Sequence, residues 1–119
     1  MRGLGQGEVL RCPDRFGREV VLRTSQWDNH ALIRHPELSG QELAVARVLQ
    51  YPDVITRDAK HPNGENFYAL GVLAPPQHRV YLKVCVRFGA VGSPPQTMGV
   101  IITAFPCSPI KPSEVQLWP

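Results

Sequence analysis

Residues 80–88, VYLKVCVRF, place the strongest constraint on the fold, because apolar and polar side chains alternate through the whole stretch. Alternate residues of an extended chain point to opposite sides. One side of this stretch is apolar and consists of Val80, Leu82, Val84, Val86 and Phe88. The other side consists of Tyr81, Lys83, Cys85 and Arg87. The pattern predicts a β-strand with one face in the core and the other face carrying two cations.

Further strands are expected where short β-prone stretches are bounded by turn residues. Residues 8–12 and 18–24 flank the turn PDRFG and predict an opening hairpin. HPNG at 61–64 predicts a second turn, between strands at 54–58 and 66–73. The final strand is expected at 98–105. We expect its faces to carry Ile101, Thr103 and Phe105 on one side and Val100, Ile102 and Ala104 on the other.

Two helices are expected between the hairpin and the later strands. The first should start near Gln26, where Thr24 or Ser25 can cap it. It should end near Arg34 or the next residue, because Pro36 disfavours the α conformation in the residue before it.

The second helix is expected to begin at Ser39. Ser39-Gly40-Gln41-Glu42 has the form of a capping box, in which the serine and glutamate side chains bond reciprocally to the first turn. Pro52 ends the helix. Its sequence, ELAVARVLQ, is apolar almost all round, which predicts that it packs on a sheet.

These elements predict an α+β fold, with an N-terminal hairpin and two helices packed on an antiparallel sheet of about four strands. The length of 119 residues suits a single domain spanning residues 1–119. Within it, residues 1–7 are expected to be a flexible N-terminus. Residues 106–119 are expected to be a Pro-rich C-terminal strap that anchors through Leu117 and Trp118.

The composition narrows the class of protein. Hydrophobic residues make up 43% and charged residues 19%, and no apolar run approaches the roughly 20 residues of a membrane helix. The first residues lack the apolar core of a signal peptide, and the three cysteines form neither an even set nor a CxxC pair. We therefore expect a cytoplasmic protein that does not bind membranes. The formal charge of +3 is compatible with a phosphate-rich partner without requiring one.

Histidines and cysteines invite a search for a metal site or a cysteine nucleophile. His30 and His35 are five residues apart, about 140° around a helix, and no other pair has the spacing of a zinc site. We expect neither a metal nor another cofactor. Cys85 lies between Lys83 and Arg87, but the sequence pairs no histidine with it, so a packed thiol is the stronger interpretation.

A set of cationic and imidazole side chains remains. His30 and Arg34 are neighbours on one helical face, and Lys83 and Arg87 share one face of a strand. Thr103, on the following strand, is expected beside Lys83 or Cys85, depending on the register. Such a set suits RNA cleavage by the substrate's own 2′-hydroxyl, which needs only a proton acceptor, a proton donor and cations. The other interpretation is an ordinary solvated face.

Several stretches of the chain resemble a family of small bacterial and phage proteins assigned to the barnase/EndoU/colicin/RelE-like ribonuclease superfamily. The resemblance extends from about Asp14 to Trp118. Its most specific parts are the helix motif WDNHALIRHPE and the strand element ITAF. The other stretches that carry it are YPDVITRD, the strand with FY, VYLKVCVRF and the closing IKPSEVQLW.

The resemblance implies a metal-independent endoribonuclease, often a toxin with a cognate antitoxin or immunity protein. It would cleave RNA to a 2′,3′-cyclic phosphate. The matching motifs imply four catalytic residues: His30 on the helix, Lys83 and Arg87 on the basic strand, and Thr103 in the ITAF element. The residues expected to bind or orient the phosphate are Arg34 and Tyr68, with His35 and Arg57 as second-rank candidates.

The sequence also departs from the family pattern. Ala69 and Leu70 stand where the family commonly has a basic residue, and Phe105 replaces a tyrosine, so one phosphate contact and one donor are expected to be missing. The alternative function is a non-catalytic protein- or nucleic-acid-binding module of the same fold. Convergence of the four candidate catalytic residues in one pocket would favour the enzyme, since a general base must reach its proton directly or through one water.

Overall fold

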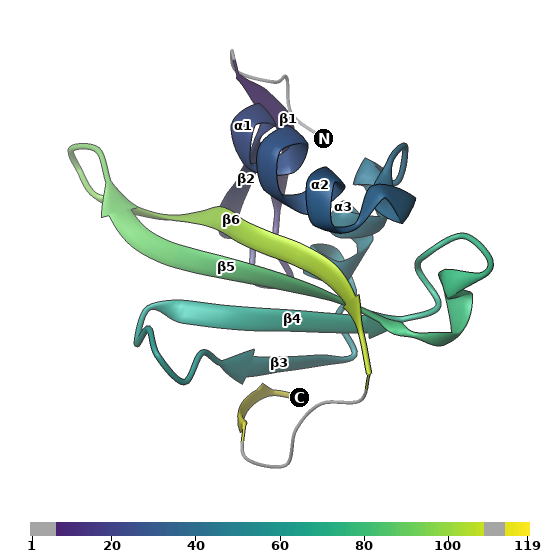
Figure 1. Ribbon diagram of the computed structural model, residues 1–119. Coiled ribbons are helices and arrows are strands. Elements are labelled where there is room, and N and C mark those ends of the chain that lie inside the picture. Colours follow the sequence, from purple (N-terminus) through teal and green to yellow (C-terminus); the bar gives the residue numbers. More distant parts are fainter. Residues whose placement is uncertain (1–6, 109–113) are drawn as a thin grey trace.

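A seven-stranded mixed sheet forms the frame of the protein in the computed structural model, which describes residues 7–108 and 114–119 (Figure 1). The strands lie in the order β1-β2-β6-β5-β4-β3-β7. The helices gather on one side of the sheet, near β5 and β6 (Figure 1). The expected α+β class is confirmed. Residues 1–6 of the expected flexible N-terminus and residues 109–113 of the expected strap lie outside the described residues.

The N-terminal hairpin is confirmed as β1 (Glu8–Pro13) and β2 (Glu19–Arg23), paired antiparallel. Asp14 fixes its turn: the buried carboxylate accepts hydrogen bonds from the backbone N–H groups of Phe16 (2.9 Å) and Arg18 (2.8 Å). β2 then pairs parallel with β6 over Glu19–Val21. The hairpin is therefore part of the main sheet, whereas the sequence predicted it only as a separate N-terminal hairpin.

The first helical run follows β2 without a loop and spans Thr24 to Arg34. It comprises α1 (Thr24–Gln26), a π-helical segment (Trp27–Ala31) and α2 (Leu32–Arg34). Its expected end before His35 is confirmed. The expected cap is wrong: within the described residues no side chain caps the helix, and the Thr24 N–H donates to the carbonyl of Gly7 (2.8 Å).

The expected capping box at Ser39 is also wrong. A 3₁₀ turn spans Pro36–Leu38, Gly40 takes a positive φ of 79°, and α3 begins only at Glu42 (Glu42–Gln50). The Glu42 carboxylate accepts a hydrogen bond from the indole N–H of Trp27 (3.2 Å), so it ties the two helices together. α3 buries Val45, Val48 and Leu49 against β1, β4 and β5, as expected for a helix packed on a sheet.

The remaining strands are β3 (Val54–Arg57), β4 (Gly64–Leu70), β5 (Tyr81–Val91), β6 (Gln96–Cys107) and β7 (Val115–Trp118). A 3₁₀ turn at Gln77–Arg79 connects β4 to β5. All neighbours in this part are antiparallel. The expected count of about four strands is too low, because β1 and β2 extend one edge and β7 adds to β3 at the other. Trp118 packs against the core, whereas Leu117 is exposed.

A β-bulge in β6 overturns the expected alternation of residues 98–105. Cys85 of β5 pairs with Thr103, but Val86 pairs with Ile101, so Ile102 is an extra residue. Ile101 and Ala104 are consequently both buried, while Ile102 is exposed. Bulges bend a strand and redirect its side chains. Here the bulge places Thr103 on the same face as Cys85 and carries Ile101 into the core.

The core lies between the helices and one face of the sheet. Leu82, Val84, Val86 and Phe88 of β5 are buried there, which confirms the predicted apolar face. In the described part of the chain, no helix combines the length and apolar character needed to cross a membrane.

Candidate functional site

The face of the sheet away from the core carries Tyr68, Lys83, Cys85 and Thr103, four of the residues considered from the sequence. Strand register places Thr56, Asn66, Cys85 and Thr103 side by side across four strands. The neighbouring row contains Tyr68, Lys83 and Phe105. We call this surface the open face and define it by Thr56, Asn66, Tyr68, Lys83, Cys85, Thr103 and Phe105. It is not simply a solvated surface, because Thr56, Asn66 and Tyr68 are buried.

Lys83 lies near the middle of the open face, between two aromatic rings. Its ammonium is 5.4 Å from the ring centroid of Tyr68 and 5.5 Å from that of Phe105. None of the ion pairs within the described residues involves Lys83. Aromatic rings attract and position a cation without neutralising its charge. Lys83 is therefore suited to binding an anionic group that approaches the open face.

Glu114, which was not among the residues predicted for the site, reaches the open face from the segment just before β7. Its carboxylate accepts hydrogen bonds from the hydroxyls of Tyr68 (2.5 Å) and Thr56 (2.9 Å). Burial raises the pKa of Tyr68 well above its ordinary value, and the bond to Glu114 raises it further. The Tyr68 hydroxyl thus donates its proton to the hydrogen bond with Glu114. What Tyr68 contributes to the open face is its ring, which lies beneath Lys83.

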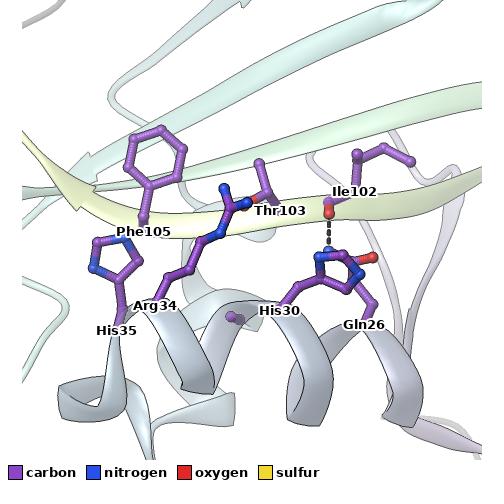
Figure 2. A pocket seen from close by; sticks show the side chains of 8 residues that line it. Gln26, His30, Arg34, His35, Ile102, Thr103 and Phe105 are labelled. Atoms are coloured by element: carbon purple, nitrogen blue, oxygen red, sulfur yellow. Dashed lines mark hydrogen bonds between the residues drawn. The ribbon is translucent and has the colours of Figure 1, made fainter.

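A pocket of about 480 Å³ lies between the first helical run and β6, and we call it the helix pocket (Figure 2). Its lining residues are Gln26, His30, Ala31, Arg34, His35, Ile102, Thr103 and Phe105. Figure 2 shows His30, Arg34 and His35 projecting from the helix side and Thr103 and Phe105 from the strand side. In the same view Arg34 extends toward Thr103. The helix motif and the ITAF element therefore meet in this pocket.

The helix lies here because β2 stops pairing with β6 at Val21, opposite Val100. Beyond that point the edge of β6 would expose its backbone polar groups, which need partners. Gln26 supplies one, since its side-chain amide donates to the carbonyl of Ile102 at the bulge (Figure 2). Burial of Trp27 and Ala31 anchors the other side of the helix in the core. This arrangement leaves His30 and Arg34 facing the pocket.

His35 and Phe105 form one wall of the helix pocket. Their rings stack with centroids 5.9 Å apart and planes inclined by 20°. The Nδ1 atom of His35 is 3.1 Å from a carboxylate oxygen of Glu37, which fixes the orientation of the ring. Phe105, the residue that departs from the family's tyrosine, therefore contacts His35 on one side and Lys83 on the other.

A second pocket, of about 210 Å³, lies beneath the connection between β3 and β4, and we call it the loop pocket. Its lining residues are Asp58, Lys60, His61, Gly64, Cys85, Val86, Arg87, Ile102 and Thr103. It shares Ile102 and Thr103 with the helix pocket, so the two pockets meet at the β6 bulge. Arg87 lines this second pocket and not the first.

The candidate residues thus converge in two adjoining pockets instead of one. His30, Arg34, His35 and Thr103 meet in the helix pocket, and Lys83 lies next to Phe105 in its wall. Arg57 does not join them, because it follows Thr56 in β3 and strand alternation directs it to the opposite side of the sheet.

The geometry also bears on two further chemistries, a cysteine nucleophile and a metal site. Burial raises the pKa of the Cys85 thiol to about 11, so this sulfur is protonated at neutral pH and does not suit a nucleophile. Among the described residues, no three His, Cys, Asp or Glu side chains are grouped as a metal site would require.

The fold and the site define an α+β protein whose sheet face carries Lys83 between two aromatic rings. Its two adjoining pockets are lined by imidazole, guanidinium and hydroxyl groups among apolar side chains. Comparison with protein-family models, curated proteins and solved structures finds no match to this chain.

Proposed function

We propose that the protein is a metal-independent endoribonuclease that cleaves RNA through the substrate's 2′-hydroxyl and leaves a 2′,3′-cyclic phosphate. The observation that carries the proposal is the helix pocket. It brings the imidazole of His30 and the guanidinium of Arg34 opposite the hydroxyl of Thr103. These groups match the proton-transfer and charge-stabilising requirements of a reaction whose nucleophile comes from the RNA.

Each residue has a defined part in this mechanism. His30 accepts the proton of the 2′-hydroxyl as the 2′-oxygen forms its bond to phosphorus. The bond from phosphorus to the 5′-oxygen breaks, and His35, the second imidazole of the pocket, donates a proton to that leaving oxygen. Arg34 and Lys83 bind the phosphate and stabilise the charge that builds on it, and Thr103 donates a hydrogen bond that orients it.

The same proposal covers the biological setting. A nuclease that needs only RNA and no cofactor would act in the cytoplasm, where RNA is plentiful. Such an activity harms the cell that makes it, so a toxin with a cognate antitoxin or immunity protein fits the resemblance to the bacterial and phage family. The open face, with Lys83 lacking an ion pair among the described residues, is the surface that an acidic inhibitor would cover.

The alternative is a non-catalytic nucleic-acid- or protein-binding module of the same fold. One observation favours it: Arg87 lies in the adjoining pocket, so the basic residues are distributed along a surface instead of around one atom. A binding surface needs only such a distribution. The experiment on His30 separates the two functions, because binding does not require proton transfer.

The test compares wild type, His30→Ala and His78→Ala on labelled RNA in EDTA, with the chemistry of the new ends determined. His78 is exposed in the Gln77–Arg79 turn and lines neither pocket, so it controls for loss of a histidine. We expect His30→Ala to lower cleavage about a hundred-fold or more, since a general acid or base typically contributes that much. His78→Ala should cleave normally. Absent cleavage by wild type, or equal cleavage by all three proteins, would contradict the proposal, and RNA binding without cleavage would establish the alternative.

A further inference from the structure

The loop pocket is built on a connection whose shape is fixed by its own hydrogen bonds. A carboxylate oxygen of Asp58 accepts from the backbone N–H groups of Lys60 (2.8 Å) and His61 (3.0 Å). The Asp58 N–H donates to the Gly64 carbonyl (3.0 Å), and the Gly64 N–H donates to the His61 carbonyl (2.8 Å). The wall of the pocket is therefore formed before any ligand binds.

Gly64 shows how closely this connection is packed. A Cβ atom at this position would lie 2.8 Å from the Cβ of Asp58 and 3.1 Å from the carbonyl oxygen of His61. Both atoms belong to the rigid part of the loop, so a larger residue would push the loop away from β5. The backbone N–H of Phe88 also donates to the carbonyl of Asn63 (2.9 Å), which ties the loop to the strand opposite. A preformed wall of this kind lowers the entropic cost of binding.

The size of the loop pocket indicates that it extends another site. Independent small-molecule sites typically have volumes of roughly 300–1,000 Å³. The loop pocket, at about 210 Å³, is smaller than that range, whereas the helix pocket, at about 480 Å³, lies within it. Because Thr103 and Ile102 line both, the two pockets adjoin, and a ligand longer than the helix pocket has the loop pocket next to it.

The chemistry of the loop pocket is mixed, in contrast to a simple anion site. Lys60 and Arg87 contribute cations at exposed positions, whereas Asp58 contributes a carboxylate. The backbone N–H of Lys60 is the main cause of a lowered pKa at Asp58, so this carboxylate is ionised at neutral pH. A carboxylate repels phosphate but accepts hydrogen bonds from the amino group of a base. A nucleotide can bind both kinds of group, because its phosphate is an anion for the cations and its base carries amino donors for the carboxylate, at separate ends of the molecule.

We infer that the loop pocket is a second nucleotide subsite for single-stranded RNA, which binds a nucleotide beyond the two that flank the cleaved bond. This inference rests on the proposed function. The phosphate of that nucleotide binds Arg87 and Lys60, and its base donates to Asp58. Only an unpaired base can turn into such a pocket, so duplex RNA is excluded as a substrate. Bases with an exocyclic amino group bind better than uracil, since they present an additional donor to the carboxylate.

The test measures binding of fluorescently labelled 2′-O-methyl oligonucleotides, whose blocked 2′-oxygen prevents cleavage. A dinucleotide reaches the helix pocket alone, whereas a tetranucleotide also reaches the loop pocket. Arg87→Ala is compared with Arg79→Ala, an exposed arginine that lines neither pocket. We expect Arg87→Ala to weaken tetranucleotide binding about tenfold. The slope of the logarithm of the binding constant against the logarithm of salt concentration should become shallower by about 0.7 per lost phosphate contact. Dinucleotide binding should not change, and Arg79→Ala should bind both ligands normally.

A second variant addresses the base. Asp58→Asn keeps an oxygen that can accept the two backbone hydrogen bonds of the loop and removes the charge. We expect it to reduce the preference for tetranucleotides that place adenine or cytosine, rather than uracil, in the loop pocket.

The outcomes separate the subsite from the function on which it rests. If wild type neither cleaves RNA nor binds either ligand, the proposed function fails. If wild type cleaves RNA but Arg87→Ala binds the tetranucleotide normally, the subsite is wrong and the ribonuclease stands. If Arg87→Ala weakened the binding of the dinucleotide and of the tetranucleotide equally, the subsite would also be overturned, because Arg87 would then lie at the cleaved phosphate.

Discussion

Two cations, Arg18 and Lys83, lie over aromatic rings on opposite sides of the sheet, and their surroundings differ. Arg18 is 3.8 Å from the ring centroid of Phe88 and also bonds two carboxylates, Asp14 (2.7 Å) and Glu65 (2.8 Å). Lys83 has two rings and no carboxylate partner among the described residues. The charge of Arg18 is neutralised within the fold, whereas the charge of Lys83 is left for a ligand.

This difference separates a structural cation from a functional one. Arg18 connects the hairpin turn to β4, because Asp14 follows β1 and Glu65 lies in β4. Removing it would leave Asp14, whose side chain is 0% exposed, as a buried charge without its partner. Within the described residues, Lys83 joins no elements through an ion pair, so its loss breaks none of the ion pairs found there. The two residues should therefore respond in opposite ways to removal.

The largest effect is expected for Arg18→Ala. We expect it to lower the free energy of unfolding by about 3 kcal/mol, since breaking a buried ion pair leaves an uncompensated charge. Urea denaturation followed by circular dichroism measures the change. Arg79→Ala is the matched control and should stay within about 0.5 kcal/mol of wild type, as surface substitutions usually do. Equal stability of the Arg18 variant and the control would show that the charge cluster is not structural.

The second largest effect is expected at Lys83, where activity should fall and stability should not. Lys83→Met keeps an unbranched side chain over the two rings and removes the charge. We expect RNA cleavage to fall about a hundred-fold, as on removal of one charge-stabilising group, with the free energy of unfolding within about 0.5 kcal/mol of wild type. Cleavage kinetics and urea denaturation are measured on the same preparation. A stability loss as large as that of Arg18→Ala would make Lys83 a structural cation and remove the contrast.

Local patterns in the sequence predicted the elements that depend on local physics. The alternation of residues 80–88 predicted the two faces of β5, and Pro36 predicted the end of the first helix. The helix caps were wrong at both places, because tertiary partners replaced the local ones. Gly7 bonds the Thr24 N–H, and the Glu42 carboxylate bonds Trp27 instead of its own helix.

The features missed in the site all depend on residues distant in the chain. The β6 bulge at Ile102 is set by pairing with β5 and by the Gln26 side chain, neither of which a local pattern encodes. Glu114 reaches Tyr68 only because β7 pairs with β3. The loop pocket requires the β3–β4 connection to lie over Arg87. Of the residues that line the two pockets, the sequence therefore singled out His30, Arg34, His35, Arg87 and Thr103, but neither the loop residues Asp58, Lys60 and His61 nor the division into two pockets.

A third prediction concerns alkaline pH and the Cys85 thiol on the open face. Burial raises its pKa from 9.0 to about 11, so the folded state holds the proton more tightly than the unfolded state. The resulting stability is complete below pH 9.0 and is lost as pH rises toward about 11. Cys85→Ala should make the free energy of unfolding fall less steeply over this window. The fall should not vanish, because burial also raises the pKa of Cys12 to about 11. Identical pH profiles for the two proteins would show that Cys85 is not desolvated.

The smallest effect is expected for Glu114→Gln, which tests how the floor beneath Lys83 is held. The amide oxygen can still accept from Tyr68 and Thr56, but hydrogen bonds to a charged acceptor are about twice as strong as neutral ones. We therefore expect a loss of about 1 kcal/mol in the free energy of unfolding. Because the carboxylate helps to raise the pKa of Tyr68, the variant should ionise this tyrosine at lower pH, measured by ultraviolet absorbance with Tyr68→Phe to assign the signal. An unchanged tyrosine titration would mean that burial alone holds the proton, and Lys83 would then depend on the Tyr68 ring without help from β7.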